Sequence, residues 1–366
     1  MTYLKARQYV AWGGILIWMV VAAALWGLSY RDLWPEALDQ RLSAVGLLMA
    51  LQIGVGLPLD WLGGYWLPHR YARSEISLGE WFISWAKAAV AQALLMGLLV
   101  LVLMGATAWL GWLGALGWLA ISMLLLLGFQ FYLHLGLTWH PHLMENNQGR
   151  LLFLVRQKDR TFTGGIYGIP GKESIVYPEY WRDRFPEAVN RLLVARRHGA
   201  VNTGAHGRGV LLALGWNLLL FAAAVYLSPE MPSQGHGLLG TVGAFTLLSV
   251  LTPLLPLPWL SRRAVYEMDR WTYYQRMNPD DLRRSIELTH RLREDTGEEK
   301  LPLSRWMSTP SRARREAHFA SQKAVQGAWQ ASRQANFASW AGFNLLNRSW
   351  PDQLGRPELW VFPPVD

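Results

Sequence analysis

Long apolar runs dominate the hydrophobic pattern of this chain. The run from Ala11 to Leu28 has no charged side chain over the roughly 18 to 20 residues that a helix needs to cross a ~30 Å hydrocarbon layer. In lipid, only helices and closed barrels satisfy their backbone hydrogen bonds. Five further runs are similarly apolar, namely residues 44–62, 88–105, 111–137, 209–227 and 237–257. We therefore predict an all-α polytopic membrane protein with about six transmembrane helices.

The placement of the basic residues predicts the orientation of these spans. The connection at 227–237 has no Lys or Arg, whereas the connection at 139–208 is rich in arginine. Because cytoplasmic connections carry the excess of Lys and Arg, both termini are expected in the cytoplasm of a bacterial-type inner membrane. The formal charge of +9 thus reflects topology, and no basic motif with interleaved aromatic residues indicates nucleic-acid binding. The absence of Cys excludes disulfides and thiolate metal sites.

The spans divide the chain into five parts. We predict an N-terminal membrane half (1–138), a cytoplasmic insertion (139–208), spans five and six (209–257), a cytoplasmic helical segment (258–315) and a C-terminal tail (316–366). Residues 173–177 are typical of a strand, and helices are expected at 186–197, 262–277 and 279–294. The result is a small α+β cytoplasmic domain between spans four and five, completed by the tail. The segment 311–340 is basic, with regularly placed aromatic residues, and either lies in the membrane interface or packs on the body.

Four short landmarks follow one another along residues 57–315. The first, at 57–87, contains a Leu-Pro pair, an Arg-Tyr pair and a Ser-Leu-Gly-Glu-Trp run; its marked positions are Pro58, Arg70, Ser77 and Trp81. The second is Thr-Gly-Gly-Ile-Tyr-Gly at 163–168, ending in Gly168. The third, at 262–270, contains Glu267 and Asp269, and the fourth, at 308–315, ends in Arg315.

In this order the landmarks resemble the integral-membrane zinc metalloproteases related to type I CAAX prenyl proteases. The resemblance implies spans that enclose a chamber receiving a polypeptide. It also implies an edge strand at 163–168 that lies beside the substrate, and it matches Glu267 to the third zinc ligand.

The motif His-Glu-x-x-His of that family is missing from its expected place. Between the edge strand and span five the chain reads Arg-Arg-His-Gly-Ala-Val-Asn-Thr-Gly-Ala-His, ending at His206. Matching His206 to a trailing family His places Arg197, His198 and Val201 at the first ligand, the general base and the second ligand. Arginine cannot ligate a cation, valine has no donor atom, and histidine is no carboxylate base. The resemblance thus predicts a degenerate member, a pseudoprotease.

Two further hypotheses concern the remaining polar residues. Arg197 is expected to pair with Glu267, supplying the positive charge in place of the metal. Alternatively, His198, His206 and Glu267 form a different metal site. Eight helical residues rise about 12 Å, so that site requires a broken helix. The histidines at the end of span four offer a second place for a metal; they are His134, His140 and His142.

The sequence therefore predicts a catalytically inactive homologue that binds a membrane-associated polypeptide as a scaffold, assembly factor or decoy. An active zinc endopeptidase with an atypical metal site, and a transporter-like conduit, are the alternatives. No cofactor is expected, and zinc enters only with the active enzyme. The expected partners are the lipid bilayer and another membrane protein or membrane-associated polypeptide, with no nucleic acid.

Overall fold

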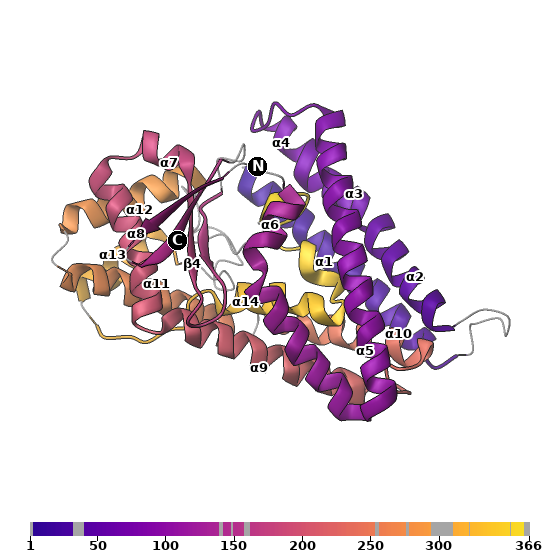
Figure 1. Ribbon diagram of the computed structural model, residues 1–366. Helices are drawn as coiled ribbons and strands as arrows, with labels where there is room; N and C mark the ends of the chain where they lie inside the picture. The colour runs from indigo at the N-terminus through magenta and orange to yellow at the C-terminus, as the bar shows by residue number, and fades with distance from the viewer. Residues whose placement is uncertain are drawn as a thin grey trace.

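The computed structural model describes residues 3–31, 40–138, 142–147, 149–156, 162–252, 256–275, 278–293, 310–321, 323–351 and 353–361. It consists of long helices on one side and a small sheet with its own helices on the other (Figure 1). Four helices are long and apolar enough to cross a membrane, judged by length and composition: Lys5–Leu28, Gln40–Arg70, Leu78–Gly128 and Ala205–Tyr226. The predicted membrane class is thus supported.

The membrane body is built from helices of the N-terminal third and of the middle of the sequence. It contains α1 (Tyr3–Leu28), α2 (Gln40–Gly54), α3 (Gly56–Trp61), the π-helical turn η1 (Leu62–Trp66), α4 (Leu67–Arg70), α5 (Leu78–Gly128), α6 (Gln130–Thr138), α9 (Ala205–Tyr226) and α10 (Gly235–Ser249). Helix α10 has 15 residues, fewer than a straight helix needs to cross a bilayer. The count of six spans therefore stays a prediction.

Helix α5 is a hairpin rather than one straight rod. Gly111 interrupts it with φ 56° and ψ −134°, which is a backbone conformation available to glycine. The indole nitrogen of Trp118 donates to the carbonyl of Leu99 at 2.7 Å, although the two residues are 19 apart in sequence. A straight helix of that length would separate them by about 28 Å, so the chain doubles back. The two arms correspond to the predicted spans at 88–105 and 111–137.

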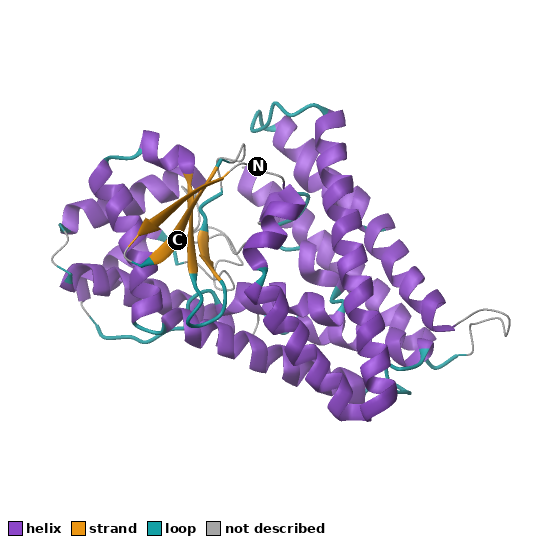
Figure 2. Cartoon of the chain, in the orientation of Figure 1, coloured by secondary structure: helices purple, strands orange, loops and turns teal. Residues whose placement is uncertain are grey.

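The second part of the fold is a four-stranded sheet with helices packed on it (Figure 2). Its strands are β1 (His142–Asn147), β2 (Arg150–Val155), β3 (Gly165–Tyr167) and β4 (Ser174–Pro178), in the order β1-β2-β4-β3. The strand predicted at 173–177 is β4, and the predicted edge strand is β3, which pairs antiparallel with β4 only.

Five helices complete this part: α7 (Glu179–Arg184), α8 (Glu187–Asn202), α11 (Pro256–Tyr274), α12 (Pro279–Arg293) and α13 (Arg312–Ser321). The predicted helices at 186–197, 262–277 and 279–294 correspond to α8, α11 and α12. Apolar side chains of β2 and β4 pack against α7 and α8; Leu154, Tyr177, Trp181 and Leu193 are all buried there. This packing fixes α8 between the sheet and α11.

The described residues of the segment 327–361, which are 327–351 and 353–361 and are called the inner tail below, lie inside the membrane body. They form α14 (Ala331–Ala338) and three short 3-10 helices, η4 (Ser339–Gly342), η5 (Leu345–Arg348) and η6 (Pro357–Leu359). Figure 1 shows this segment in yellow among α1, α5 and α9. Trp340 and Trp360 are fully buried in the same apolar core as side chains of α1 and α5. The sequence left open whether the segment 311–340 lies in the membrane interface or packs on the body; its described residues pack on the rest of the protein, as α13 against α11 and α12 and as α14 within the membrane body.

Candidate functional site

Helix α8 is the element on which the protease motif was expected. It begins after Pro186 and ends at Asn202. The chain then turns at Gly204, whose φ of +72° is in the left-handed region, and continues as α9. The break between His198 and His206 that an atypical metal site would need is therefore present. Whether the rings of His198 and His206 point to a common site depends on which faces of α8 and α9 carry them.

One face of α8 packs on α11 and carries Arg196 and Ala200. The guanidinium of Arg196 lies 2.7 Å from the carboxylate of Asp269. Ala200, one turn further, is buried in an apolar cluster with Val265 and Met268 of α11. This arrangement follows from the helical period, since residues four apart lie on one face.

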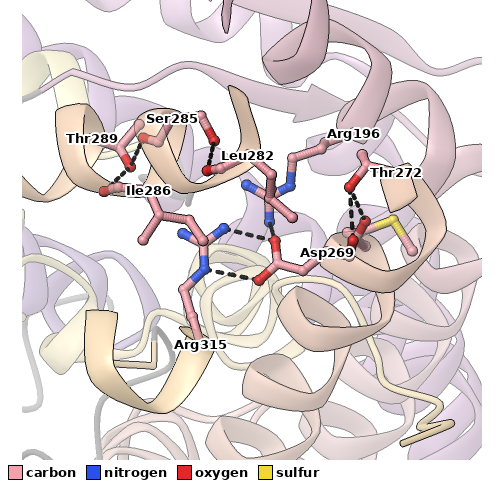
Figure 3. A network of polar contacts seen from close by, with 9 residues as sticks. Arg196, Asp269, Thr272, Leu282, Ser285, Ile286, Thr289 and Arg315 are labelled. Atoms are coloured by element: carbon pink, nitrogen blue, oxygen red, sulfur yellow. Dashed lines mark hydrogen bonds and ion pairs between the residues drawn. The ribbon is translucent and has the colours of Figure 1, made fainter. Parts of the chain in front are cut away.

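Asp269 is the centre of a buried ion cluster (Figure 3). Besides Arg196 it binds Arg315 of α13, with distances of 2.9 Å from Nε to Oδ2 and 2.7 Å from Nη2 to Oδ1. Burial alone would raise the pKa of this carboxyl, but the two guanidinium groups hold the pKa below its ordinary value. The carboxylate is therefore ionised at neutral pH and joins α8, α11 and α13.

The neighbouring side chain, Arg197, points the other way, toward the sheet. Its Nη2 donates to the carbonyl of Thr163 at 2.6 Å, and its guanidinium carbon lies 5.1 Å from the ring centre of Tyr177 and 5.8 Å from that of Trp181. Cation–π contacts of this kind stabilise a buried guanidinium. Arg197 is thus part of the packing between α8 and the sheet.

His198 faces the β1–β2 hairpin. Its Nε2 lies 3.0 Å from the side-chain oxygen of Asn147, and its Nδ1 lies 3.2 Å from Nη1 of Arg150. Because Arg150 can only donate, Nδ1 accepts, and the ring proton sits on Nε2, which donates to Asn147. Burial and the nearby guanidinium lower the pKa of His198. The ring is neutral at pH 7 and is used in a structural contact.

Glu267 binds Arg208 of α9 and not Arg197. Nη2 of Arg208 lies 2.8 and 2.9 Å from the two carboxylate oxygens, and the backbone N–H of Gly327 donates to Oε2 at 2.8 Å. The predicted Arg197–Glu267 pair is therefore wrong. Arg197 is directed at the sheet, whereas Arg208 follows the Gly204 turn and is brought against α11.

The atypical set of His198, His206 and Glu267 does not converge either. Nε2 of His206 donates to the carbonyl of Gly168 at 3.0 Å, beyond the end of the edge strand. The three side chains thus point to the sheet hairpin, to the edge strand and to Arg208. Within the described ranges, no group of three His, Cys, Asp or Glu residues is placed to hold a metal ion.

The histidines after span four are used in ring packing. His134 is buried and stacks on Phe162, with ring centres 6.1 Å apart. His142 meets the ring of Phe131 edge-on at 5.3 Å. His140 lies outside the described residues.

A solved structure shares this architecture. The crystal structure of S. mikatae Ste24p matches with a TM-score of 0.61, covering 87% of this chain and 99% of that chain at 10% sequence identity. This chain has the fold of Ste24p. Ste24p is an integral membrane zinc metalloprotease related to CAAX proteases, so the resemblance stated from the sequence holds at the level of the fold. Comparisons with protein families and with curated proteins give no match.

The Ste24p-like fold gives a geometric test for zinc. A zinc held by two α8 side chains one turn apart and a carboxylate of α11 needs its ligands on the face where these helices pack. That face carries Arg196 and Ala200 opposite Val265. None of the three has a donor for zinc, so the residues do not fit the ion. Arg197, matched to the first ligand position in the sequence, points away from this face to the carbonyl of Thr163, whereas Val201 borders the apolar cluster of the face.

The other family positions have structural contacts. Ser77 caps α5 in a reciprocal box with Glu80. The indole of Trp81 donates to the carbonyl of Gly355 at 3.3 Å. Trp81 also lines, with Pro58, an open apolar pocket at the start of α5. Arg70 lies over the ring of Trp66 at 6.0 Å. Gly168 adopts φ +94°, and a Cβ there would meet the carbonyl of Lys172 at 2.3 Å.

Sequence reasoning missed the buried Arg196–Asp269–Arg315 cluster and a further buried ion pair. Asp60 of α3 lies 3.3 Å from Arg348 of the inner tail, and both side chains are almost completely buried. The available signal was a carboxylate within an otherwise apolar run. Its partner could not be recognised, because nothing in the sequence places the polar tail among apolar helices.

Proposed function

We propose that this protein is a non-catalytic relative of the membrane zinc proteases, which binds a membrane-associated polypeptide and does not cleave it. One observation carries the proposal: the face shared by α8 and α11 presents Arg196, Ala200 and Val265, where a zinc protease requires metal ligands. The Ste24p-like fold supports the part concerning a polypeptide, because it is the fold of a protease. A scaffold, an assembly factor and a decoy all fit this role.

The positive charges at the site support the same proposal. Two arginines surround Asp269, and a third binds Glu267. A guanidinium beside each carboxylate satisfies that carboxylate electrostatically but cannot activate water as a Lewis acid. The arrangement therefore stabilises the fold without supplying the chemistry of peptide hydrolysis.

The experiment is metal analysis of the full-length protein purified in mild detergent, with a peptide-cleavage assay on the same sample. We expect substoichiometric zinc and no chelator-sensitive cleavage. The protein should be loaded with zinc and dialysed before the measurement, so that loss during purification does not mimic the expected result. One zinc per chain, together with cleavage that a chelator abolishes, would instead support the atypical endopeptidase.

A further inference from the structure

The inner face of the membrane body presents amide groups to the inner tail. Gln52 of α2 and Gln92 of α5 both donate to the side-chain oxygen of Asn347, at 3.3 and 3.5 Å. Gln130 of α6 donates to the backbone carbonyl of Val361 at 2.6 Å. Buried amides are costly without partners, and lipid tails offer none. The lining thus has the chemistry that recognises a polypeptide backbone and polar side chains.

The inner tail enters between α9 and α11 through a clamp on Gly327. The N–H of Gly327 donates to Glu267 at 2.8 Å, while Nε of Arg208 donates to its carbonyl at 2.8 Å. A Cβ at this position would lie 1.9 Å from the backbone nitrogen of Ala264, so only glycine passes here. The Arg208–Glu267 pair therefore holds Gly327 by both its backbone N–H and its backbone carbonyl.

The far end of the inner tail is held by charged side chains of the body. Asp60 accepts from the indole of Trp85 and from the N–H of Gly355, both at 2.8 Å, and it pairs with Arg348. Arg7 of α1 donates to the carbonyl of Leu354 at 3.2 Å. A buried carboxylate in this position needs a cation, and the tail supplies it.

We infer that the space within the membrane body is a polypeptide-binding site, and that residues 327–361 of this chain are its resident ligand. The inference rests on the proposed function, because it identifies the bound polypeptide of the resting protein. It also defines the chemistry of a competitor. Another polypeptide entering the site must displace the inner tail, bring a glycine to the Arg208–Glu267 clamp, and place a basic side chain against Asp60.

The chain offers a clean test of where the tail lies, because it has no Cys. The N–H of Leu345 lies 3.3 Å from Oγ1 of Thr246 on α10. Cysteines at these two positions should form an oxidative cross-link in native membranes. The matched control keeps the tail cysteine and moves the other to Leu219, which is 62% exposed on α9. Equal cross-linking of both pairs, or none of the first, would overturn the inference.

Exchange then tests whether the tail is a ligand. A specific protease site inserted between Lys323 and Ala324, which are exposed, separates the tail from the body of the folded protein. After cutting, the fragment should remain bound, and a fluorescent peptide of residues 324–361 should replace it. The helical circular dichroism of the body should stay unchanged. A body that unfolds when the fragment leaves, or a fragment that does not exchange, would identify the tail as fixed core.

Variants at the far end sharpen the exchange test. Asp60→Asn leaves the guanidinium of Arg348 buried without its counter-charge and should speed exchange at least tenfold. Adding Arg348→Gln removes the unpaired charge and should reverse most of that acceleration. Arg312→Gln, which alters an exposed pair with Glu316, is the control and should not change the exchange rate. An unchanged exchange rate in Asp60→Asn would contradict the inference that the Asp60–Arg348 pair holds the tail in place.

The two proposals fail separately. Zinc content and cleavage, measured on the uncut protein, test the proposed function alone. A zinc-loaded protease whose tail exchanges would overturn that function and leave the binding site standing. A metal-free, inactive protein whose tail never exchanges would do the opposite.

Discussion

Arg196 and Asp269 form an ion pair with a nitrogen–oxygen distance of 2.7 Å, in which the two side chains are only 1% and 2% exposed. The arginine stands on the α8 face where a metal ligand would have to lie. A buried carboxylate requires a nearby cation, and here a covalently attached guanidinium meets that requirement. This ion pair thus joins α8 and α11 across the faces on which they pack.

The first prediction concerns this carboxylate. Asp269→Asn leaves Arg196 and Arg315 buried without their shared counter-charge, and it should destabilise the folded protein by about 3–5 kcal/mol. Thermal or denaturant unfolding in detergent, followed by circular dichroism, measures the loss. The control is Glu316→Gln, which breaks an exposed pair with Arg312 and should cost no more than about 1 kcal/mol. Equal effects would contradict the buried cluster.

A second prediction concerns the helix face on which a zinc site can be built. The four changes Arg196→His, Arg197→Glu, Ala200→His and Val265→Glu place two imidazoles and a carboxylate on the faces of α8 and α11 that meet. This variant should bind about one zinc per chain. The control set is Arg197→His, His198→Glu and Val201→His, whose first residue points at the sheet, and it should bind none. Zinc binding by the control set but not by the first set would show that the ligand-bearing face of α8 contains Arg197 and Val201 instead of Arg196 and Ala200.

Acid sensitivity is expected at His198. Its pKa is lowered in the folded state by burial and by Arg150, so as the pH falls through the ordinary histidine pKa of about 6.5 the unfolded chain binds the proton first. Stability from this group is therefore present at neutral pH and is lost as the pH falls through the folded pKa. His198→Gln removes the titration, and its melting temperature should fall less on acidification. Parallel pH profiles for both proteins would argue against the assignment.

The last prediction compares two glycines with positive φ. Gly355 has φ +68°, and a Cβ there would lie 2.1 Å from the carbonyl oxygen of Asp60; Gly149 has φ +79° with open space around it. Both alanine variants bear the backbone penalty of about 1–2 kcal/mol, and Gly355→Ala adds an overpacking cost of about 1–3 kcal/mol. Unfolding in detergent should therefore show a larger loss of folding free energy for Gly355→Ala than for Gly149→Ala. Equal losses would show that the backbone at residue 355 can move to make room for the added Cβ.

Much of the fold can be predicted because apolar runs and helix caps act locally. The membrane helices, the strand at β4 and the helices α8, α11 and α12 follow from such patterns. The two arms of the α5 hairpin are predicted as separate spans, whereas the unusual backbone conformation of Gly111 at the turn between them is not specified by any local pattern. The position of the inner tail depends on partners in eight different helices, and no local pattern specifies them.

The candidate site shows where sequence reasoning loses precision. A run of two arginines gives no internal reference for helix phase, so Arg197 was assigned the role that the packing gives to Arg196. The direction of each arginine side chain depends on a partner that is distant in the sequence. Arg196 binds Asp269, Arg197 binds the carbonyl of Thr163, and Arg208 binds Glu267. Each choice turns on about 100° of helix rotation between neighbouring residues.

The inner tail also sets the order in which the protein can be assembled. Residues 327–361 leave the ribosome after every helix that surrounds them, yet they form the centre of the finished body. The surrounding helices are therefore made before the tail partners of Gln92 and Asp60, namely Asn347 and Arg348, are available to them. During that interval the half-built body is a receptor without its ligand, and any stalled or shortened translation product would remain in it.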